Sequence, residues 1–376
     1  MKPIRIMAIV VLVAAGVVLS GHFLASPAPQ PSDPQEAADL AALAGVHPID
    51  THTHVFQNSP AYYRMLKQLN MRTVDICVVS RAKEPPDRTQ RAQFHMAMLV
   101  HRGSGGRVAV CTTFDPYPFR DRNFDRNTIN VVNENFREGA IAVKIWKNIG
   151  MDLKGPSGKY VEPDNPVFEP IYKDIAAHNK TLIAHLAEPD TCWEPLASIS
   201  PANPDYVYYK EHPRWHMYGK PDAPVKAEIL AARDHLLAEN PHLRVVGAHL
   251  GSMETSVDEI ARRFDRYPNF AVDTAARIRY LMAQPRAKVR AFLIKYQDRV
   301  CYGTDGDIGP GADAAERIKS WEYQYAMSWK YFATDETFEY QGLEVRGLDL
   351  PRSVVRKIYH ENAVHWFPGV APKASQ

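Results

Sequence analysis

The chain has 376 residues, of which 45% are hydrophobic, so it can bury a large core and shows no sign of global disorder. That length fits one large α/β domain or two small domains. The formal net charge is only +2 and no basic stripe carries interleaved aromatic residues, so the composition gives no support for nucleic-acid binding.

The first residues are typical of an export signal. Lys2 and Arg5 form a positive start, an apolar run extends over 6–19, and small residues follow around Ala25. The run is short for a spanning helix, which needs roughly 20 apolar residues, although extension to Ala25 could just form an anchor. We expect residues 1–25 to be a signal peptide or membrane anchor. The protein would then be periplasmic or held at the outer face of the cytoplasmic membrane.

A Pro-rich spacer follows this segment. Residues 26–36 read SPAPQPSDPQE, a composition that cannot form a core. We expect a disordered linker over 26–40 and a single folded domain over 41–370.

Short apolar runs then alternate with longer amphipathic segments. The runs are rich in Val, Ile and small residues without strict alternation, which is typical of strands buried on both faces. They begin at residues 49, 74, 108, 140, 181, 244, 270 and 300. Helical periodicity begins at 127, 167, 225 and 256, and a last helix is expected at 351. Eight strand–helix units predict a (β/α)8 TIM-type barrel, and no GxGxxG motif supports a dinucleotide fold.

Three predicted loops are unusually long and would lie at the C-terminal face of the barrel, over 147–165, 188–223 and 307–350. The middle loop is rich in aromatic residues: Trp193, Tyr206, Tyr208, Tyr209, Trp215 and Tyr218. These side chains would form a lid or pocket wall, or they would pack the underside of their own loop.

The four cysteines, Cys77, Cys111, Cys192 and Cys301, have no zinc-finger spacing. Three lie in apolar strand-like runs, where buried thiols are common. Export would permit a disulfide, but the sequence cannot pair them.

His52 and His54 form an H-x-H pair on the first predicted strand. Fifteen histidines in 376 residues give about 0.6 such pairs by chance, so the pair alone is weak. On a strand, however, residues two apart point to the same side, and two imidazoles on one side suit a divalent metal.

Three further metal-competent residues end later strands: His185, His249 and Asp305. In a barrel, polar residues at the C-terminal ends of strands are typical of a catalytic site. Five such groups on strands one, five, six and eight predict a metal centre.

The segments HTH at 52, IAHLAEP at 183, GAHLGS at 247 and YGTDG at 302, in this order, resemble the amidohydrolase superfamily. The closing segment at 357–369, KIYHENAVHWFPG, resembles the amidohydrolase-related branch, which includes aminocarboxymuconate semialdehyde decarboxylase. The resemblance covers about residues 47–369.

The resemblance implies a barrel with one divalent metal, usually zinc, although manganese is an alternative. Its ligands would be His52, His54, His185 and Asp305, and His249 would be a catalytic acid/base. In binuclear relatives a fourth-strand lysine is carbamylated and bridges two metals, a position that Lys144 matches. If it were carbamylated, Lys144 would be a ligand of a second metal. An unmodified ammonium binds no metal, so Lys144 would then be a substrate-binding residue. We favour one metal.

We expect hydrolysis of a small amide, ester or lactone by metal-activated water. Asp305 would accept the proton and pass it to the leaving group, and His249 would stabilise the developing oxyanion. The same site supports non-oxidative decarboxylation of an aromatic or enoic acid. A third reading is a non-catalytic tethered binding protein. The expected partner is a small-molecule substrate. Contact with a membrane would require an uncleaved N-terminal anchor. A homodimer is possible.

Four more residues near the predicted site have two interpretations each. Arg277 and Arg279 could grip a carboxylate, but we favour ordinary helix-surface arginines. Glu188 and Asp307 could be hydrogen-bond partners of the ligand histidines, or loop residues with no such role.

Overall fold

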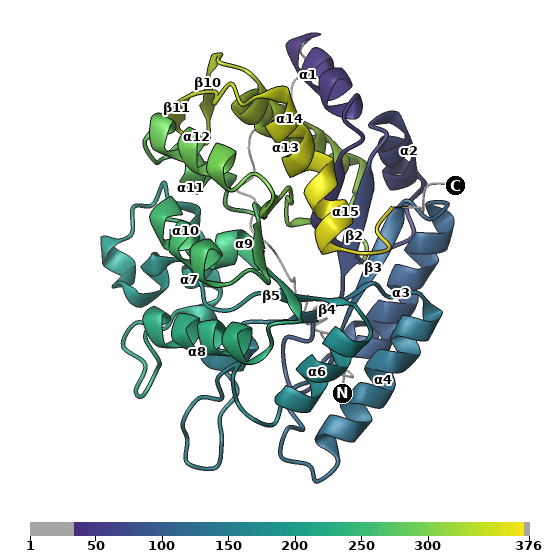
Figure 1. The fold of residues 1–376 in the computed structure, drawn as a ribbon, viewed down its shortest axis with the longest axis vertical. Coiled ribbons are helices and arrows are strands. Elements are labelled where there is room, and N and C mark those ends of the chain that lie inside the picture. The colour runs from purple at the N-terminus through teal and green to yellow at the C-terminus, as the bar shows by residue number, and fades with distance from the viewer. Residues whose placement is uncertain (1–33, 372–376) are drawn as a thin grey trace, which may run out of the picture.

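The computed structural model describes residues 34–371. The predicted signal or anchor segment and the first part of the predicted linker lie outside these residues. The folded part begins earlier than expected, because Pro34–Ala44 forms helix α1. Its sequence is rich in Ala and Leu, which are strong helix formers. Leu43 is fully buried, and Asp39 forms a 3.5 Å ion pair with Lys330 of helix α13 (Ala314–Ala333), against which α1 packs (Figure 1).

A parallel sheet forms the centre of the molecule. Its strands are β1 (Ile49–Val55), β2 (Arg72–Ile76), β3 (Val108–Thr113), β4 (Ala142–Ile145), β5 (Thr181–Ala184), β6 (Arg244–Gly247), β7 (Phe270–Asp273), β8 (Val300–Cys301) and β9 (Gly306–Ile308). Their order is β8-β7-β6-β5-β4-β3-β2-β1-β9, so β1 to β8 pair in chain order and β9 pairs with β1. All eight predicted strand positions are confirmed, because these Val- and Ile-rich runs are buried on both faces.

The eighth barrel strand is in two parts, β8 and β9, interrupted at 302–305. The backbone N–H of Thr51 in β1 donates to the Tyr302 carbonyl at 2.9 Å. The N–H of Asp305 donates to the His52 carbonyl, also at 2.9 Å. These bonds join the end of the sheet to its beginning, and the helices surround it as in a TIM-type barrel (Figure 1).

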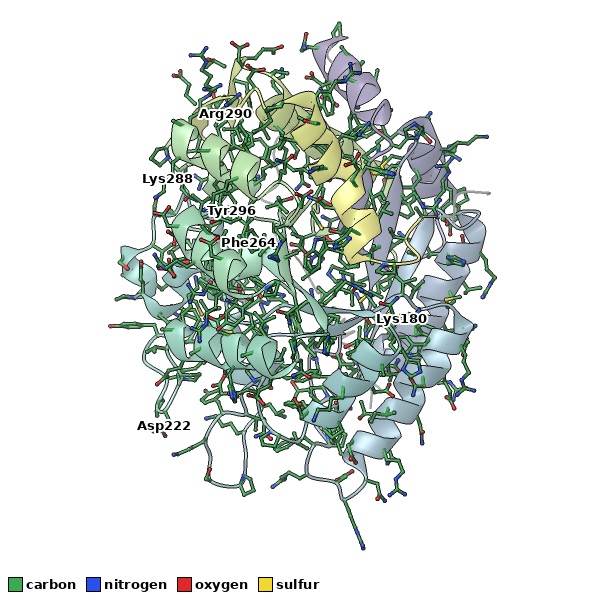
Figure 2. The ribbon with its side chains drawn as sticks, in the orientation of Figure 1. Lys180, Asp222, Phe264, Lys288, Arg290 and Tyr296 are labelled. Atoms are coloured by element: carbon green, nitrogen blue, oxygen red, sulfur yellow. The ribbon has the colours of Figure 1, made fainter. Side chains whose placement is uncertain are left out.

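Amphipathic helices cover the outside of the sheet. They include α2 (Pro60–Gln68), α3 (Gln90–Gly103), α4 (Phe124–Glu138), α6 (Glu169–Ala177), α8 (Lys226–Glu239), α10 (Val257–Arg266) and α12 (Arg286–Lys295). Two neighbouring helices, α10 and α12, pack through aromatic side chains that Figure 2 labels. The ring centres of Phe264 in α10 and of Tyr296, just after α12, are 5.4 Å apart. The predicted last helix is confirmed as α14 (Arg352–Arg356), a π-helical turn over Lys357–Glu361, and α15 (Asn362–Trp366). Across residues 34–371, no helix has both the length and the apolar character of a membrane span.

The prediction of a long loop over 307–350 is wrong. This region contains α13 and a hairpin of β10 (Thr337–Tyr340) and β11 (Leu343–Arg346). Asp313 caps α13 by accepting from the N–H groups of Ala315 and Glu316. The α13 residue Trp321 packs against Gly306, where any side chain would collide with the indole ring.

The other two predicted loops contain short elements. α5 (Asn148–Met151) lies in the first, and α7 (Pro204–Glu211) and three short 3₁₀ turns lie in the second. All four cysteines are buried free thiols.

Candidate metal centre

His52, His54 and Asp305 converge where β1 meets the break in the eighth strand. Oδ1 of Asp305 lies 3.3 Å from Nε2 of His52 and 3.3 Å from Nε2 of His54. One potential ligand atom from each residue lies within 4.8 Å of the others. Two ligands of a tetrahedral zinc site, each about 2.0–2.1 Å from the metal, are about 3.3–3.4 Å apart. The observed spacing therefore fits a single divalent ion.

Both histidines are oriented by a bond at their other ring nitrogen. Nδ1 of His52 donates to Oδ2 of Asp273 at 2.8 Å, and Nδ1 of His54 donates to the Ile76 carbonyl at 2.8 Å. Because these partners are acceptors, the proton lies on Nδ1 and the Nε2 lone pair faces the shared point. Burial also lowers the pKa of His52, so its ring is neutral at pH 7, as a ligand must be.

Asp305 and Lys144 are two ionisable groups that lie beside these histidines. Burial raises the pKa of Asp305, but His249, His54 and His52 outweigh burial and hold the pKa well below its usual value. Asp305 is therefore a carboxylate at every physiological pH. The Lys144 amine is buried in β4 and lies 3.2 Å from Nε2 of His52. Burial lowers the pKa of Lys144 to about 8, against the attraction of Asp273 and Asp305.

His185 and His249 form a second chain of hydrogen bonds in the same site. Nδ1 of His249 donates to the Ala275 carbonyl at 2.9 Å, which leaves Nε2 of His249 as an acceptor for Nδ1 of His185 at 3.1 Å. Nε2 of His185 then carries a lone pair, and this atom is buried without a partner among the described residues. His185 lies outside the three-residue ligand group, but its free nitrogen is available to a metal.

Asp273 is the functional residue that the sequence analysis missed. It is fully buried, and besides His52 it accepts from the backbone N–H groups of His249 at 2.8 Å and Ala275 at 3.1 Å. Burial raises the pKa of Asp273, but the hydrogen bond from His52 and the nearby His249 and Lys144 lower it by a larger amount, so Asp273 is ionised. It ends β7, so the strand-end reasoning that identified Asp305 could also have identified it.

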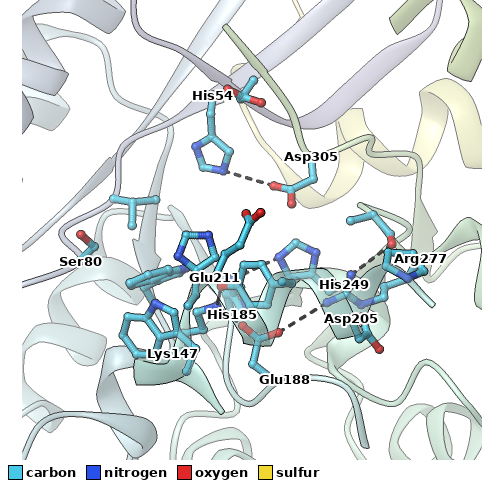
Figure 3. A pocket seen from close by; sticks show the side chains of 18 of the residues that line it. His54, Ser80, Lys147, His185, Glu188, Asp205, Glu211, His249, Arg277 and Asp305 are labelled. Atoms are coloured by element: carbon cyan, nitrogen blue, oxygen red, sulfur yellow. Dashed lines mark hydrogen bonds and ion pairs between the residues drawn. The ribbon is translucent and has the colours of Figure 1, made fainter. Parts of the chain in front are cut away.

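A cavity of about 720 Å³ opens beside the metal centre. His54, His185, His249 and Asp305 line it, as Figure 3 shows. Of the loop aromatics, Tyr208 and Trp215 form part of its wall. Tyr209 is instead buried beneath the loop, and Tyr218 is exposed. Both interpretations of the aromatic loop are therefore correct, each for different residues.

Charged residues of the cavity wall are arranged differently from our expectation. Arg277 and Arg279 line the cavity and are not ordinary helix-surface arginines, because the turn after β7 directs them inward. Glu188 forms ion pairs with Lys147 and Arg277 (Figure 3), and Asp307 lies 4.0 Å from Arg317. Neither carboxylate bonds a ligand histidine; Asp273 has that role.

Comparison with known proteins agrees with this description of the fold. The amidohydrolase family profile matches residues 149–369, which is more than half of the chain. No curated protein sequence matches. The structure of dihydroxybenzoic acid decarboxylase from Polaromonas sp. JS666, with bound manganese and the inhibitor 2-nitroresorcinol, is similar with a TM-score of 0.51. The two are 12% identical, over 87% of this chain and 98% of that one.

Two other solved structures have lower scores. They are 2,6-dihydroxybenzoate decarboxylase from Rhizobium and 4-oxalomesaconate hydratase from Rhodopseudomonas palustris. The first has a TM-score of 0.47 and 13% identity over 85% of this chain and 98% of that one. The second has 0.48 and 11%, over 86% and 96%.

The barrel and its metal-competent strand ends define a metal-dependent enzyme, which sets aside the reading as a non-catalytic binding protein. The chain belongs to the amidohydrolase family, and within it to the amidohydrolase-related branch.

Proposed function

We propose that the protein is a hydrolase that uses one divalent metal to cleave a small amide, ester or lactone. The observation that carries this proposal is the convergence of two Nε2 lone pairs and the Asp305 carboxylate at a spacing suited to one ion. We further propose zinc as the ion, with manganese as the alternative, and His185 as a fourth ligand through its unpartnered Nε2.

The bound ion would activate water and polarise the carbonyl of the substrate. His249 suits the role of proton acceptor better than that of oxyanion donor, because the Ala275 carbonyl takes its only N–H. Burial holds the pKa of His249 well below its usual value, so the ring is neutral at pH 7 and Nε2 is an acceptor; a substrate proton would replace the bond that Nε2 accepts from Nδ1 of His185. Asp305 stays ionised, which favours its role as a ligand and makes it a weaker base.

We propose a single metal, with Lys144 unmodified. The Lys144 amine lies 3.2 Å from Nε2 of His52, and burial lowers its pKa only to about 8, so it is mainly an ammonium at pH 7 and has no lone pair for a second metal. Elemental analysis of the purified protein tests this assignment. One ion per chain supports it, whereas two ions and a mass increase on Lys144 would make this lysine a bridging ligand.

Decarboxylation of an aromatic or enoic acid is the second candidate. The aromatic wall of the cavity favours it: the Lys147 amine lies 5.0 Å from the ring centre of Trp146 and 4.9 Å from those of Tyr208 and Trp215. A planar aromatic acid would pack against such rings. Parallel assays of acid release and carbon dioxide release, with zinc or manganese added, separate the two reactions.

The ligand assignment is tested with His52→Ala and Asp305→Ala. Both variants are expected to lose the metal and the activity, because each removes one of three converging ligands. His178→Ala, on the protein surface, is the matched control and should keep both. A metal-free variant with full activity would overturn the proposal. Export through residues 1–25 is a separate proposal, tested by the N-terminal sequence of protein from cell fractions.

A further inference from the structure

The turn after β7 fixes Arg277 rigidly at the cavity wall. Ala276 has a left-handed backbone, with φ of 53°, and its N–H donates to the Thr304 carbonyl at 3.1 Å. The N–H of Arg277 donates to the Thr274 carbonyl at 3.0 Å. The guanidinium carbon of Arg277 lies 5.7 Å from the ring centre of Tyr280, which closes one side of this position. The side chain thus faces the cavity beside His249 (Figure 3).

The guanidinium of Arg277 uses only part of its donor capacity. Nη1 donates to the Ala276 carbonyl at 3.1 Å. Nε is buried and has no hydrogen-bond partner among the described residues. Nη2 lies 3.7 Å from Oε2 of Glu188, which is an ion pair but too long for a hydrogen bond. Nε and Nη2 form one edge of the group, the edge that can bind both oxygens of a carboxylate.

Two carboxylates near Arg277, Glu188 and Asp205, have hydrogen-bond partners other than Arg277. Oε1 of Glu188 is bonded to Lys147, which holds the group back from Arg277. Oδ2 of Asp205 accepts from Thr191 at 2.7 Å and from Tyr280 at 2.6 Å.

A second arginine of the same cavity shows the complete arrangement. Nε of Arg214 donates to Oδ1 of Asp152 at 3.0 Å, and Nη2 donates to Oδ2 at 2.5 Å. The same edge in Arg277 has no such acceptor. A buried N–H without an acceptor is costly and rare in native proteins, so an acceptor brought by a ligand fits here.

We propose that the Nε–Nη2 edge of Arg277 binds a carboxylate of the substrate. The substrate class is then a small carboxylic acid that also carries the reacting group, which reaches the metal centre in the same cavity. The identity of the reacting group rests on the proposed function; the carboxylate site does not. Lys147 is not a direct binding group in this arrangement, because it holds Glu188 in place and so prevents Glu188 from filling the edge.

Isothermal titration of the metal-loaded full chain with benzoate and with benzamide tests the proposal. Benzamide has the same shape without the charge. Benzoate should bind wild-type protein at least about tenfold more tightly than benzamide, because it makes two charge-assisted hydrogen bonds. Arg277→Gln should weaken benzoate by about tenfold or more and leave benzamide within about twofold. Arg277→Lys, which keeps the charge but lacks the edge, should also weaken benzoate.

Arg279→Gln is the matched control. It removes a positive charge from the same cavity, but Nε of Arg279 already donates to the Gln341 carbonyl at 3.3 Å. Benzoate affinity should change by less than about threefold in this variant. Equal binding of benzoate and benzamide, no binding of benzoate, or unchanged benzoate affinity in both Arg277 variants would overturn the proposal.

The same titration with metal-free His52→Ala separates the two proposals. Benzoate should still bind this variant more tightly than benzamide, because Arg277 does not depend on the ion. Loss of that preference would show that benzoate binds to the metal and not to Arg277, and would overturn the Arg277 site. If instead the preference persists while wild-type protein contains no metal, the proposed hydrolase fails and the carboxylate site stands.

Discussion

Replacement of Asp273 by Asn should weaken metal binding without removing any ligand. Asp273 accepts three hydrogen bonds, from Nδ1 of His52 and from the backbone N–H groups of His249 and Ala275. An amide has one oxygen, so in Asp273→Asn its NH₂ group must face at least one of these donors. His52 then loses the carboxylate that keeps its proton on Nδ1 and its Nε2 lone pair toward the ion.

The expected cost follows from these contacts. Loss of such a supporting group lowers metal affinity by about 10- to 100-fold, which corresponds to about 1.4–2.7 kcal/mol. One buried donor left without an acceptor lowers the free energy of unfolding by about 1–3 kcal/mol. Zinc affinity is measured by competition with a chromogenic chelator, and unfolding is followed in denaturant by circular dichroism.

Asp75→Asn provides the control. Asp75 is another buried strand carboxylate near the site, and Oδ1 accepts from the Val55 N–H at 2.8 Å, but it bonds no histidine. Its zinc affinity should stay within about threefold of wild type. If Asp273→Asn binds zinc as tightly as Asp75→Asn does, the reasoning that Asp273 orients His52 is refuted.

Three further predictions concern pH, metal and the aromatic loop. Burial raises the pKa of Asp75 from 3.8 to about 7, so the native state binds more protons between these values and stability falls as pH rises, by up to about 1.4 kcal/mol per pH unit. The melting temperature of Asp75→Asn minus that of wild type should therefore increase from pH 4 to pH 7. A difference that stays constant over this range would contradict the raised pKa of Asp75. Metal at 100 times its Kd should raise the free energy of unfolding by about 2.7 kcal/mol, and a chelator should reverse this gain in wild type but leave His52→Ala unaffected. Arg214→Met removes the ion pair with Asp152 and should speed hydrogen exchange over 204–218, measured by mass spectrometry, with a stability loss of at most about 1 kcal/mol; unchanged exchange would show that this pair does not hold the loop.

The barrel could be predicted from the sequence because its strands carry their own signal. Runs such as TLIAHLA at 181 and RVVGAHL at 244 are apolar on both faces and carry a histidine near their C-terminal end, which places strand and site together. Asp305 and the histidines were identified in the same way. The helix α13 was missed because it lies inside a region that we interpreted as one long loop, although Asp313 and the apolar spacing around Trp321 and Tyr325 are helix signals.

The partners of the site residues could not be predicted. Asp273 and Glu188 are both acidic residues near a strand end, yet one bonds His52 and the other bonds Lys147. That difference depends on the direction of each side chain after the fold has formed. The inward position of Arg277 likewise depends on the left-handed residue before it, an alanine, which gives no such signal in the sequence.

The contact between β1 and the interrupted eighth strand, called the seam here, both closes the barrel and positions the candidate metal ligands. The backbone bonds that close the barrel, at the Thr51 N–H and the His52 carbonyl, lie next to the histidine pair, so the barrel closes where the candidate ligands meet. A local opening of this seam would part Asp305 from His52 and His54 while the rest of the core stayed packed. An ion bound by these three residues would cross-link the first barrel strand to the eighth. Catalytic competence and closure of the barrel would then be lost together, before the fold itself is lost.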